Sequence, residues 1–477
     1  LPPLPPMDDD ESAEQYTNAP PALPPQDDDS FDKPKAAKPG KKAKSNKEPL
    51  AGISTAPQGS IDPVGTPSTA SKLKKTIRER IHDYWVNDGV KLIFIIVYVI
   101  INIVLIGERY HYYMVRQDQS DLTPGIQITP FQVLGHGLCI ARGTAAAIKF
   151  NAAFLLVCVL RNFLSFLRGS FVGTYLPIDK NIVFHKFVAW WVMVLVTFHS
   201  GAHFINFWNV TSNRATSDEL VALNLSPDPV SYWVVVFARL PGITGVLTSI
   251  VMVLMYTSAV QYVRSNMFEA FWYTHHLFIV FYGLIAAHGQ LELLERANFW
   301  IWVLGPFSFY ALERLIRLIR GSQKTIILKA IQHPSRVLEI RMKKATFNYQ
   351  PGQYIFLQCP YIADYEWHPF TISSSPDEDF LSVHIRIVGD WTGELYQLLN
   401  PEKEIGVIQE NMLTAPNGKP ILLVDGPYGA ASEEFYKFKN LMLFSAGIGV
   451  TPMASILKDI RYQIDEGNLT NLNKVHF

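Results

Sequence analysis

Cysteine is scarce in this chain of 477 residues, which contains only Cys139, Cys158 and Cys359. Their spacing matches neither a disulfide framework nor a thiolate metal site, so iron bound here would have to be held by nitrogen. An excess of one charge is also lacking, because 42 basic and 42 acidic residues give a net charge of zero. The overall charge therefore does not indicate a nucleic-acid or acidic partner.

Two other signals are missing. No cleavable signal peptide is visible at the N-terminus. The N-terminal aspartate runs do not form the D-x-D-x-D-G loop of a calcium site, so they do not predict direct calcium regulation. The first residue is Leu1 rather than methionine, and the last four residues, 474–477, have the pattern of a strand that has just begun. We therefore expect a fragment that is incomplete at both ends.

Apolar residues are abundant and concentrated between about residues 90 and 320, although the mean hydropathy of the whole chain is only +0.11. This segment predicts a membrane region rather than a large soluble core. Six spans are expected, at Leu92–Gly107 and at about 133–160, 184–208, 243–262, 271–289 and 298–318. Basic residues before the first span (Lys72, Lys74, Lys75, Arg78 and Arg80) and after the sixth (Arg314, Arg317 and Arg320) predict that both ends of the region are cytoplasmic.

Residues 1–72 are rich in Pro, Asp, Lys and Ser and have no apolar periodicity. Such a composition buries too little surface to offset chain entropy, so this region is expected to be disordered. The segments Leu1–Asp10 and Ala22–Asp29 both join polyproline to acidic residues. They are interpreted either as docking peptides for an SH3-type or other regulatory partner or as a solvated linker.

Four histidines lie in two of the apolar segments at similar separations. His185 and His199 are fourteen residues apart, a rise of roughly 21 Å on a helix, and they return to within about 40° of one face. His275 and His288 are thirteen apart and roughly 140° out of phase, so a bulge, tilt or curvature would be needed; His276 is an alternative ligand. Polar groups in lipid are costly, and two such helices can hold two stacked haems. Isolated hydrogen-bonded histidines are the alternative.

Further polar residues lie near this predicted core. Arg142 and His203 fall in the outer halves of their spans, where a cation would stabilise an anion formed from an acceptor that meets the outer haem. Arg161 and Arg168 lie at the inner end of the second span and suit haem propionates, although positive-inside anchoring explains Arg168 equally well. Lys149 within this span is interpreted as a propionate partner or a snorkelling lysine.

From Thr325 the pattern changes to short alternating strands punctuated by Gly and Pro, which predicts a small antiparallel barrel over residues 323–418. HPFTISSSP (368–376) offers hydroxyls and backbone amides to a planar ring system, and HIRIVGDWTG (384–393) offers Arg386 and Thr392 to a pyrophosphate. From residue 419 to 477, two apolar strands followed by DGPYG (425–429) and GIGVTP (447–452) predict the start of a parallel α/β nucleotide-binding domain.

The order of these motifs carries a resemblance. FHKFVAWW, FHSGAH, FWYTHHLF, HPFTISSSP, HIRIVGDWTG, DGPYG and AGIGVTP, taken together, closely resemble the eukaryotic superoxide-generating NADPH oxidases over about residues 75–477. The resemblance implies a six-helix transmembrane bundle in residues 73–322 with two b-type haems, the inner on His185 and His275 and the outer on His199 and His288. It places the oxygen site at Arg142 and His203.

The resemblance also implies the nucleotide sites. FAD would bind at His368, Pro369, Phe370, Thr371, Ser373, Ser374, Arg386 and Thr392. NADPH would bind at Gly426, Gly429, Gly447, Gly449, Thr451 and Pro452, in a domain that the chain contains only in part.

The expected reaction passes electrons from cytosolic NADPH through FAD and two haems to O2 on the far side of the membrane. The short loop after His288 favours superoxide as the released product. A transmembrane ferric or cupric reductase using the same electron path is the first alternative. A haem-free proton channel or scaffold with a degenerate dehydrogenase half is the second.

Overall fold

The computed structural model describes residues 76–115, 128–212, 216–223, 231–290, 295–399, 420–468 and 472–477. The docking peptides and disorder predicted for residues 1–72 lie outside these ranges, as does the end predicted for the barrel at residue 418. Two compact units are distinguished, and of the smaller one, Leu23–Gly89, only the beginning of the first helix is described. The described part of the larger unit, Val90–Phe477, contains a helical bundle and a soluble half.

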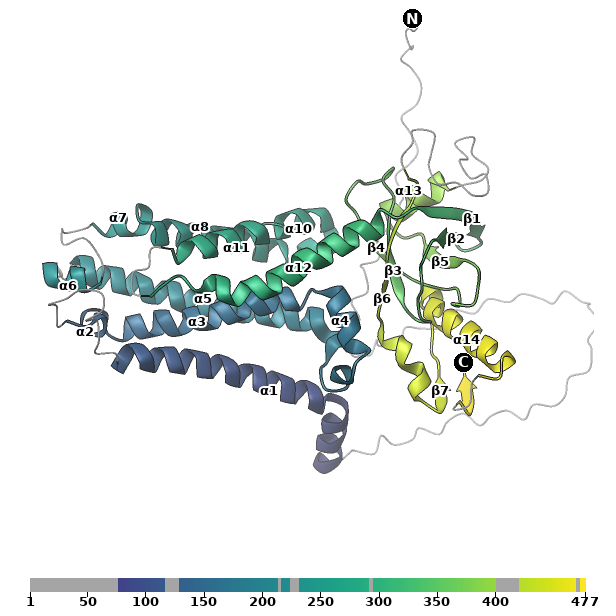
Figure 1. The fold of residues 1–477 in the computed structure, drawn as a ribbon, viewed down its shortest axis with the longest axis horizontal. Coiled ribbons are helices and arrows are strands. Elements are labelled where there is room, and N and C mark those ends of the chain that lie inside the picture. Colours follow the sequence, from purple (N-terminus) through teal and green to yellow (C-terminus); the bar gives the residue numbers. More distant parts are fainter. Residues whose placement is uncertain are drawn as a thin grey trace, which may run out of the picture. The chain divides into compact units, whose positions relative to one another are not determined.

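The bundle is built from long apolar helices, of which α3, α5, α8 and α12 run side by side in Figure 1. The long helices are α1 (Ile77–Val115), α3 (His136–Val157), α5 (Asn181–Ser212), α8 (Leu240–Ser258), α10 (Phe268–His275), α11 (Phe278–His288) and α12 (Phe299–Gly321). Shorter helices connect them: α2 (Pro130–Leu134), α4 (Arg161–Arg168), α6 (Ser217–Ala222), α7 (Tyr232–Phe237) and α9 (Gln261–Asn266).

Five helical segments of the described chain are long and apolar enough to cross a membrane: Ile77–Val115, His136–Val157, Ile178–Thr211, Leu240–Ser258 and Phe268–His288. They correspond to the first five predicted spans, and a membrane protein is thereby confirmed. The sixth predicted span forms α12, whose second half carries Glu313, Arg314, Arg317 and Arg320 and which contains Pro306. These charged residues lower the hydropathy of α12, which is not among the five segments apolar enough to cross a membrane. Helix α12 nevertheless packs on α3 within the bundle.

Helix ends follow the local sequence. Thr129 caps α2: its side chain accepts a hydrogen bond from the amide of Gln132, whose own side chain returns to the Thr129 amide. Pro241 occupies the first turn of α8, where a missing N–H has no cost. Both signals are local in the sequence, and the second marks the beginning of a long apolar helix.

The soluble half begins with two antiparallel sheets of three strands, in the orders β1-β2-β5 and β4-β3-β6. The strands are β1 (Thr325–His333), β2 (Val337–Lys344), β3 (Tyr354–Gln358), β4 (His368–Thr371), β5 (Leu381–Arg386) and β6 (Leu423–Tyr428). A bridge between Ile372 and Val383 links the sheets. Their inward side chains form one core with helix α13 (Asp390–Leu398), which contributes Trp391 and Leu395. The predicted antiparallel FAD-type domain is thus present.

One strand belongs to a different sheet from the one expected. The sequence pattern assigned ILLVDGPYG to the parallel nucleotide domain, but β6 pairs antiparallel with β3 and completes the second barrel sheet. An isolated apolar strand carries no information on its partner, so the pattern could not distinguish the two sheets. The parallel domain starts later, with β7 (Asn440–Met442) paired to β8 (Lys474–His476) across helix α14 (Val450–Asp465).

Candidate functional site

The four histidines meet in two pairs inside the bundle. The imidazole of His185 on α5 faces that of His275 on α10, with ring centroids 6.4 Å apart. His199 on α5 faces His288 on α11, with centroids 6.2 Å apart. Helix α5 therefore faces the α10–α11 segment with a histidine pair at each of two levels, as the spacing predicts.

The phase mismatch between His275 and His288 is partly offset by an interruption of the helix. Helix α10 ends at His275 and α11 begins at Phe278, and the amides of His276 and Leu277 bond to carbonyls three residues back. Such bonds turn the chain by about 120° per residue instead of about 100°, which moves His288 in the required direction. His276 itself is exposed and belongs to neither histidine pair. Its Nδ1 lies 2.7 Å from the carbonyl oxygen of Trp272, one turn earlier in the chain.

Hydrogen bonds set the tautomers of three of the histidines. Nδ1 of His185 lies 3.3 Å from the carbonyl oxygen of Leu155, and Nδ1 of His199 lies 2.9 Å from that of Ala141, both on α3. A carbonyl can only accept, so each Nδ1 donates and each Nε2 keeps its lone pair. The two carbonyls are also fourteen residues apart, so α3 supports both levels of α5 in the same way.

His288 is oriented by α8. Its Nδ1 lies 3.0 Å from Oγ1 of Thr244, whose hydroxyl proton is already donated to the carbonyl of Leu240 at 2.6 Å. Thr244 therefore accepts from His288, whose Nε2 is free. Gly245 leaves room for this ring, since a Cβ there would lie 3.2 Å from Cε1 of His288. Thr244 and Gly245 have no sequence signature of their own and were not predicted.

The separation of the rings suits a metal porphyrin between them. In a haem held by two imidazoles, two metal–nitrogen bonds of about 2 Å and about 1 Å from each nitrogen to its ring centre place the centroids about 6 Å apart. Both pairs lie near this value. Nδ1 of His275 is buried without a hydrogen-bond partner in the described residues. The donor set and its spacing therefore fit two bis-histidine haems.

The residues predicted for the oxygen site lie beside the His199–His288 pair. The ring of His203 is 4.6 Å from that of His199, one helical turn away on α5. The guanidinium of Arg142 lies over the ring of Tyr113 at 5.4 Å, and its buried Nε has no hydrogen-bond partner in the described chain. A cation with an unused donor is therefore available at this level of the bundle.

Lys149 has a local explanation that the sequence did not reveal. Its Nζ donates to Oδ1 of Asn298 at 2.5 Å, and Nδ2 of Asn298 donates to Glu295 at 3.0 Å. Glu295 also pairs with Arg109 at 3.4 Å. Lys149 therefore belongs to a polar network joining α1, α3 and the start of α12.

At the end of the bundle that contacts the barrel, two predicted arginines have different surroundings. Arg168 forms an ion pair with Asp179. The guanidinium of Arg161 lies 4.3 Å from the centre of the Phe356 ring on β3, between the bundle and the barrel. Arg168 is thus already neutralised, whereas Arg161 lies where the two halves meet.

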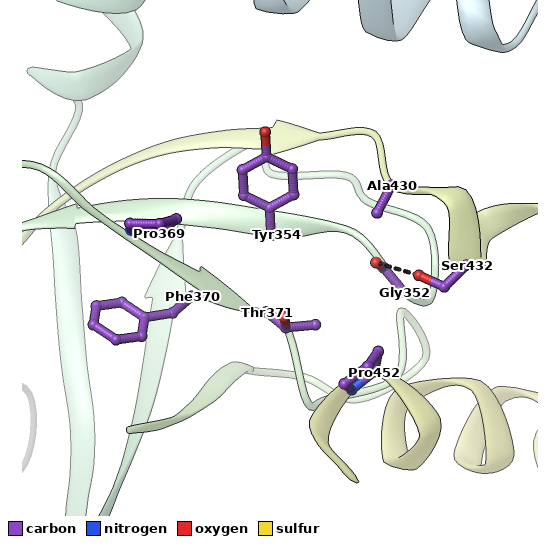
Figure 2. A pocket seen from close by; sticks show the side chains of 8 residues that line it. All are labelled: Gly352, Tyr354, Pro369, Phe370, Thr371, Ala430, Ser432 and Pro452. Atoms are coloured by element: carbon purple, nitrogen blue, oxygen red, sulfur yellow. Dashed lines mark hydrogen bonds between the residues drawn. The ribbon is translucent and has the colours of Figure 1, made fainter. Parts of the chain in front are cut away.

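The HPFT segment forms one wall of a groove in the barrel. Pro369, Phe370 and Thr371 on β4 lie opposite Pro452 at the start of α14 (Figure 2). The other lining residues are Gly352, Tyr354, Ala430 and Ser432. The cavity measures about 180 Å³, below the roughly 300–1,000 Å³ of typical ligand pockets, so it would accept part of a dinucleotide. The predicted FAD and NADPH motifs therefore adjoin one groove.

Of the other residues predicted to bind FAD, some are buried inside the barrel and some are exposed at its surface. Ser373 and Ser374 are buried; Ser373 bonds to Ser382 at 2.9 Å, and Ser374 accepts from the Ser382 amide at 2.9 Å. The hydroxyl of Thr392 accepts from the amide of Gly389 at 3.1 Å and so caps α13. The serine hydroxyls join strands, whereas Arg386, at the end of β5, is exposed.

The predicted nucleotide glycines lie in two settings. Gly447 and Gly449 are exposed and precede α14, with Gly447 at a φ of 53°, which favours glycine. Thr451 closes this turn by donating to the Ile448 carbonyl at 3.0 Å. The Gly429 amide donates to Ser165 on α4 at 3.1 Å, and Gly426 packs on β3 near Ile355. The turn before α14 is thus exposed, whereas the DGPYG turn faces the protein.

His368 contacts helix α13, which begins within HIRIVGDWTG. Its ring lies 4.2 Å from that of Trp391 on α13, and its Nε2 is 3.3 Å from the carboxylate of Glu366. Burial lowers the pKa of His368 in spite of the Glu366 carboxylate, so a neutral imidazole is favoured. The two predicted FAD motifs are therefore in direct contact.

Asp425 of DGPYG binds the last turns of α12, which the sequence did not predict. Its carboxylate accepts from Arg317 Nε at 2.7 Å, Arg320 Nε at 2.8 Å and the Tyr428 hydroxyl at 2.6 Å. Burial alone would raise the pKa of Asp425, but hydrogen bonds from Tyr428 and Arg317 and the guanidinium charges hold that pKa below its ordinary value. The i, i+3 spacing of the arginines was the available signal, interpreted as positive-inside anchoring.

Comparisons with known proteins match this architecture. A ferric reductase like transmembrane component matches residues 142–286, an FAD-binding domain residues 322–432, and a ferric reductase NAD binding domain residues 438–477. A ferredoxin NADP+ reductase from Neisseria gonorrhoeae covers 32% of this chain and 56% of its own at 19% identity, with a TM-score of 0.23, a likeness too slight to support an inference.

Curated relatives cover more of the chain. A superoxide-generating NADPH oxidase heavy chain of Dictyostelium discoideum is 52% identical over 407 residues, 84% of this chain and 75% of that protein. A second heavy chain of the same organism is 40% identical over 85% of this chain and 58% of its own length. NADPH oxidase 3 of Homo sapiens is 34% identical over 82% and 77%. This chain belongs to the family of superoxide-generating NADPH oxidases, as the order of its motifs predicts.

Proposed function

We propose that this protein carries electrons from NADPH across a membrane to O2 and releases superoxide. When bound, FAD would supply the conversion of the NADPH hydride into single electrons, and the haems would supply one-electron transfer to the acceptor. The protein contributes binding, alignment and electrostatics. The observation that carries the proposal is the pair of facing imidazoles at each of two levels of the bundle.

The inner haem is assigned to His185 and His275 and the outer haem to His199 and His288. Helix α5 separates the two levels by fourteen residues, roughly 21 Å of rise, within a hydrocarbon core of about 30 Å. The Nδ1 hydrogen bonds of three histidines support this assignment, because they leave each Nε2 lone pair for iron. Because the protein itself would supply two nitrogen ligands to each haem, the arrangement fits electron transfer to O2 without an iron–oxygen bond.

Arg142 and His203 are assigned to the oxygen site beside the outer haem. The unpaired Nε of Arg142 supports this role, because a buried donor without a partner stabilises an anion that forms next to it. His203 lies against the His199 ligand and would contact the same space. The positive charge of Arg142 would thereby stabilise superoxide relative to neutral O2.

At the inner end, Arg161 is assigned to a haem propionate. Its position between the bundle and Phe356 of the barrel supports this role. Arg168 is also assigned there, although its pairing with Asp179 leaves it less charge to offer.

FAD is assigned to the face formed by residues 368–374 with Arg386 and Thr392, where Pro369, Phe370 and Thr371 line the groove. NADPH is assigned to Gly426, Gly429, Gly447, Gly449, Thr451 and Pro452. The exposed glycine turn at the N-terminus of α14 supports phosphate binding there. The groove between Phe370 and Pro452 would bring the two nucleotides together.

Six spans with both the N-terminus and the dehydrogenase half in the cytoplasm complete the proposal, with α12 as the sixth. The arginines at the end of α12 support this orientation. Docking of an SH3-type or other regulatory partner to the proline-rich N-terminus is a further proposal and concerns residues outside the described ranges.

The test uses membranes that contain the full-length protein and NADPH. We expect cytochrome c reduction that superoxide dismutase abolishes, together with a reduced-minus-oxidised haem spectrum that corresponds to two haems per chain. Reduction of chelated iron without oxygen uptake would instead identify a metalloreductase. A protein without a haem spectrum would overturn the electron path and favour a channel or scaffold.

A further inference from the structure

Asn206 on α5 is a buried polar side chain that no residue of the described chain satisfies. Only 2% of its surface is exposed, and neither its Oδ1 nor its Nδ2 has a hydrogen-bond partner within the described ranges. Leaving such atoms unpaired is costly, and buried side-chain amides are normally satisfied by protein, by ordered water or by a bound ion. The unpaired amide of Asn206 therefore indicates a small polar guest beside it.

Asn206 shares a face of α5 with residues assigned to the outer haem and the oxygen site. It follows His199 by seven residues and His203 by three, so the three side chains lie within about 60° of one another on an ideal helix. At about 1.5 Å per residue, Asn206 lies roughly 10 Å beyond His199, on the side away from His185. Asn206 is thus the next polar residue on this face beyond the oxygen site.

The Asn206 side chain packs on the first turn of α3. A Cβ on Gly137 would overlap Oδ1 of Asn206 but would lie 3.7 Å from its Nδ2, so only glycine allows this approach, and Nδ2 is the more distant of the two polar atoms. Helix α3 begins at His136 without a side-chain cap. The N-terminus of a helix is its positive end and favours an anion nearby. Nδ2 of Asn206 is therefore an unused donor where the potential favours an anion.

Arg142 connects this position to the oxygen site. It lies five residues after Gly137 on α3, roughly 7.5 Å along the helix axis, and its buried Nε also lacks a hydrogen-bond partner in the part of the chain that the structure describes. Two buried and unused donors thus follow each other from the level of His199 toward the start of α3. Both suit a small anion, because a hydrogen bond to an ionised acceptor is roughly twice as strong as one to a neutral acceptor.

We propose that Asn206 and the first turn of α3 form a second anion position, which superoxide occupies after it leaves Arg142 and before it leaves the bundle. The inference rests on the proposed function, because it takes superoxide as the product. A neutral molecule gains little from a positive potential, so this position would draw the product outward without retaining O2. Asn206 would thereby separate superoxide from the site where it forms.

The test uses the haem-loaded, full-length protein in its oxidised state, with bromide as a monovalent probe anion. Anomalous diffraction from crystals grown in bromide locates the ion. We expect a peak within hydrogen-bond distance of Asn206 in the unchanged protein and none there in Asn206→Leu, which keeps a branched side chain but removes both polar atoms. The matched variant Asn209→Leu, half-buried and one turn further along α5, should keep the peak.

Two solution measurements accompany the diffraction experiment. Bromide should slow superoxide output, because it occupies the position that the product needs. The concentration for half inhibition should rise at least about tenfold in Asn206→Leu, as expected when a hydrogen bond to an ion is lost, and should stay unchanged in Asn209→Leu. The thermal midpoint of Asn206→Leu should not fall, because the change removes polar atoms that have no protein partner.

Three outcomes would each overturn the proposal: no bromide beside Asn206 in the unchanged protein, equal inhibition of both variants, or a lower thermal midpoint of Asn206→Leu, which would reveal a structural partner. Bromide binding needs no electron transfer, so its result is separate from the proposed function. Superoxide formation without bromide at Asn206 would refute the anion position alone. Bromide at Asn206 in a protein that reduces chelated iron but not O2 would refute the proposed function, and with it the passage of superoxide.

Discussion

Asp425 joins the last turns of α12 to the barrel, and its replacement by asparagine tests how much this contact contributes. The side chain is almost fully buried and receives hydrogen bonds from Arg317, Arg320 and Tyr428. An asparagine side chain would have nearly the same shape but no charge, and one of its two polar atoms would become a donor. That donor would face N–H or O–H groups that are already donors.

The magnitude follows from these contacts. Each hydrogen bond to a charged group contributes roughly 1.5–3 kcal/mol, and removal of one member of a buried ion pair costs roughly 3–5 kcal/mol because the other charge stays buried. Arg317 and Arg320 are only 15% and 22% exposed, so water screens them little. We expect Asp425→Asn to lower the unfolding free energy of the soluble half by roughly 3–5 kcal/mol.

The assay is denaturant unfolding of the purified protein, followed by flavin fluorescence. Asp465→Asn is the matched control, because the Arg461–Asp465 pair is 77% and 55% exposed at 2.9 Å, and such surface pairs contribute about 0–1 kcal/mol. Asp425→Asn should also slow haem reduction by NADPH, because the barrel would be held less firmly against α12. If the two variants lose similar stability, the reasoning about Asp425 is wrong.

Three further outcomes are expected. His199→Leu should remove the outer haem signal and abolish superoxide formation while FAD binding persists; superoxide output at the level of the unchanged protein would refute the ligand assignment. Arg142→Ala should slow the last electron step on the order of 10²-fold with haem content retained, and equal losses of both would make Arg142 structural. Burial lowers the pKa of Lys344 from 10.5 to about 8. Between these values the unfolded chain binds more protons, so this lysine should make stability, measured as the thermal midpoint, rise with pH; the midpoint of Lys344→Met should lack that rise.

The sequence by itself determined the elements and the kinds of residue they carry. The depth of His185 and His199 follows from their spacing in one apolar helix, and the strands from Thr325 onward follow from alternation, because both patterns are set by neighbours in the chain. The order of the motifs along the chain likewise carried the family resemblance, since that order needs no knowledge of which segments pack together.

Only the tertiary structure decided which residues meet. The turn at His276 and Leu277, the support of His288 by Thr244, the contact of Asp425 with α12 and the pairing of β6 with β3 all join segments whose partners leave no local periodic trace. A one-dimensional pattern reports which face of an element is apolar, whereas packing selects among the surfaces that could cover it. For this reason the membrane histidines could be predicted from sequence, but their tautomers and their supports could not.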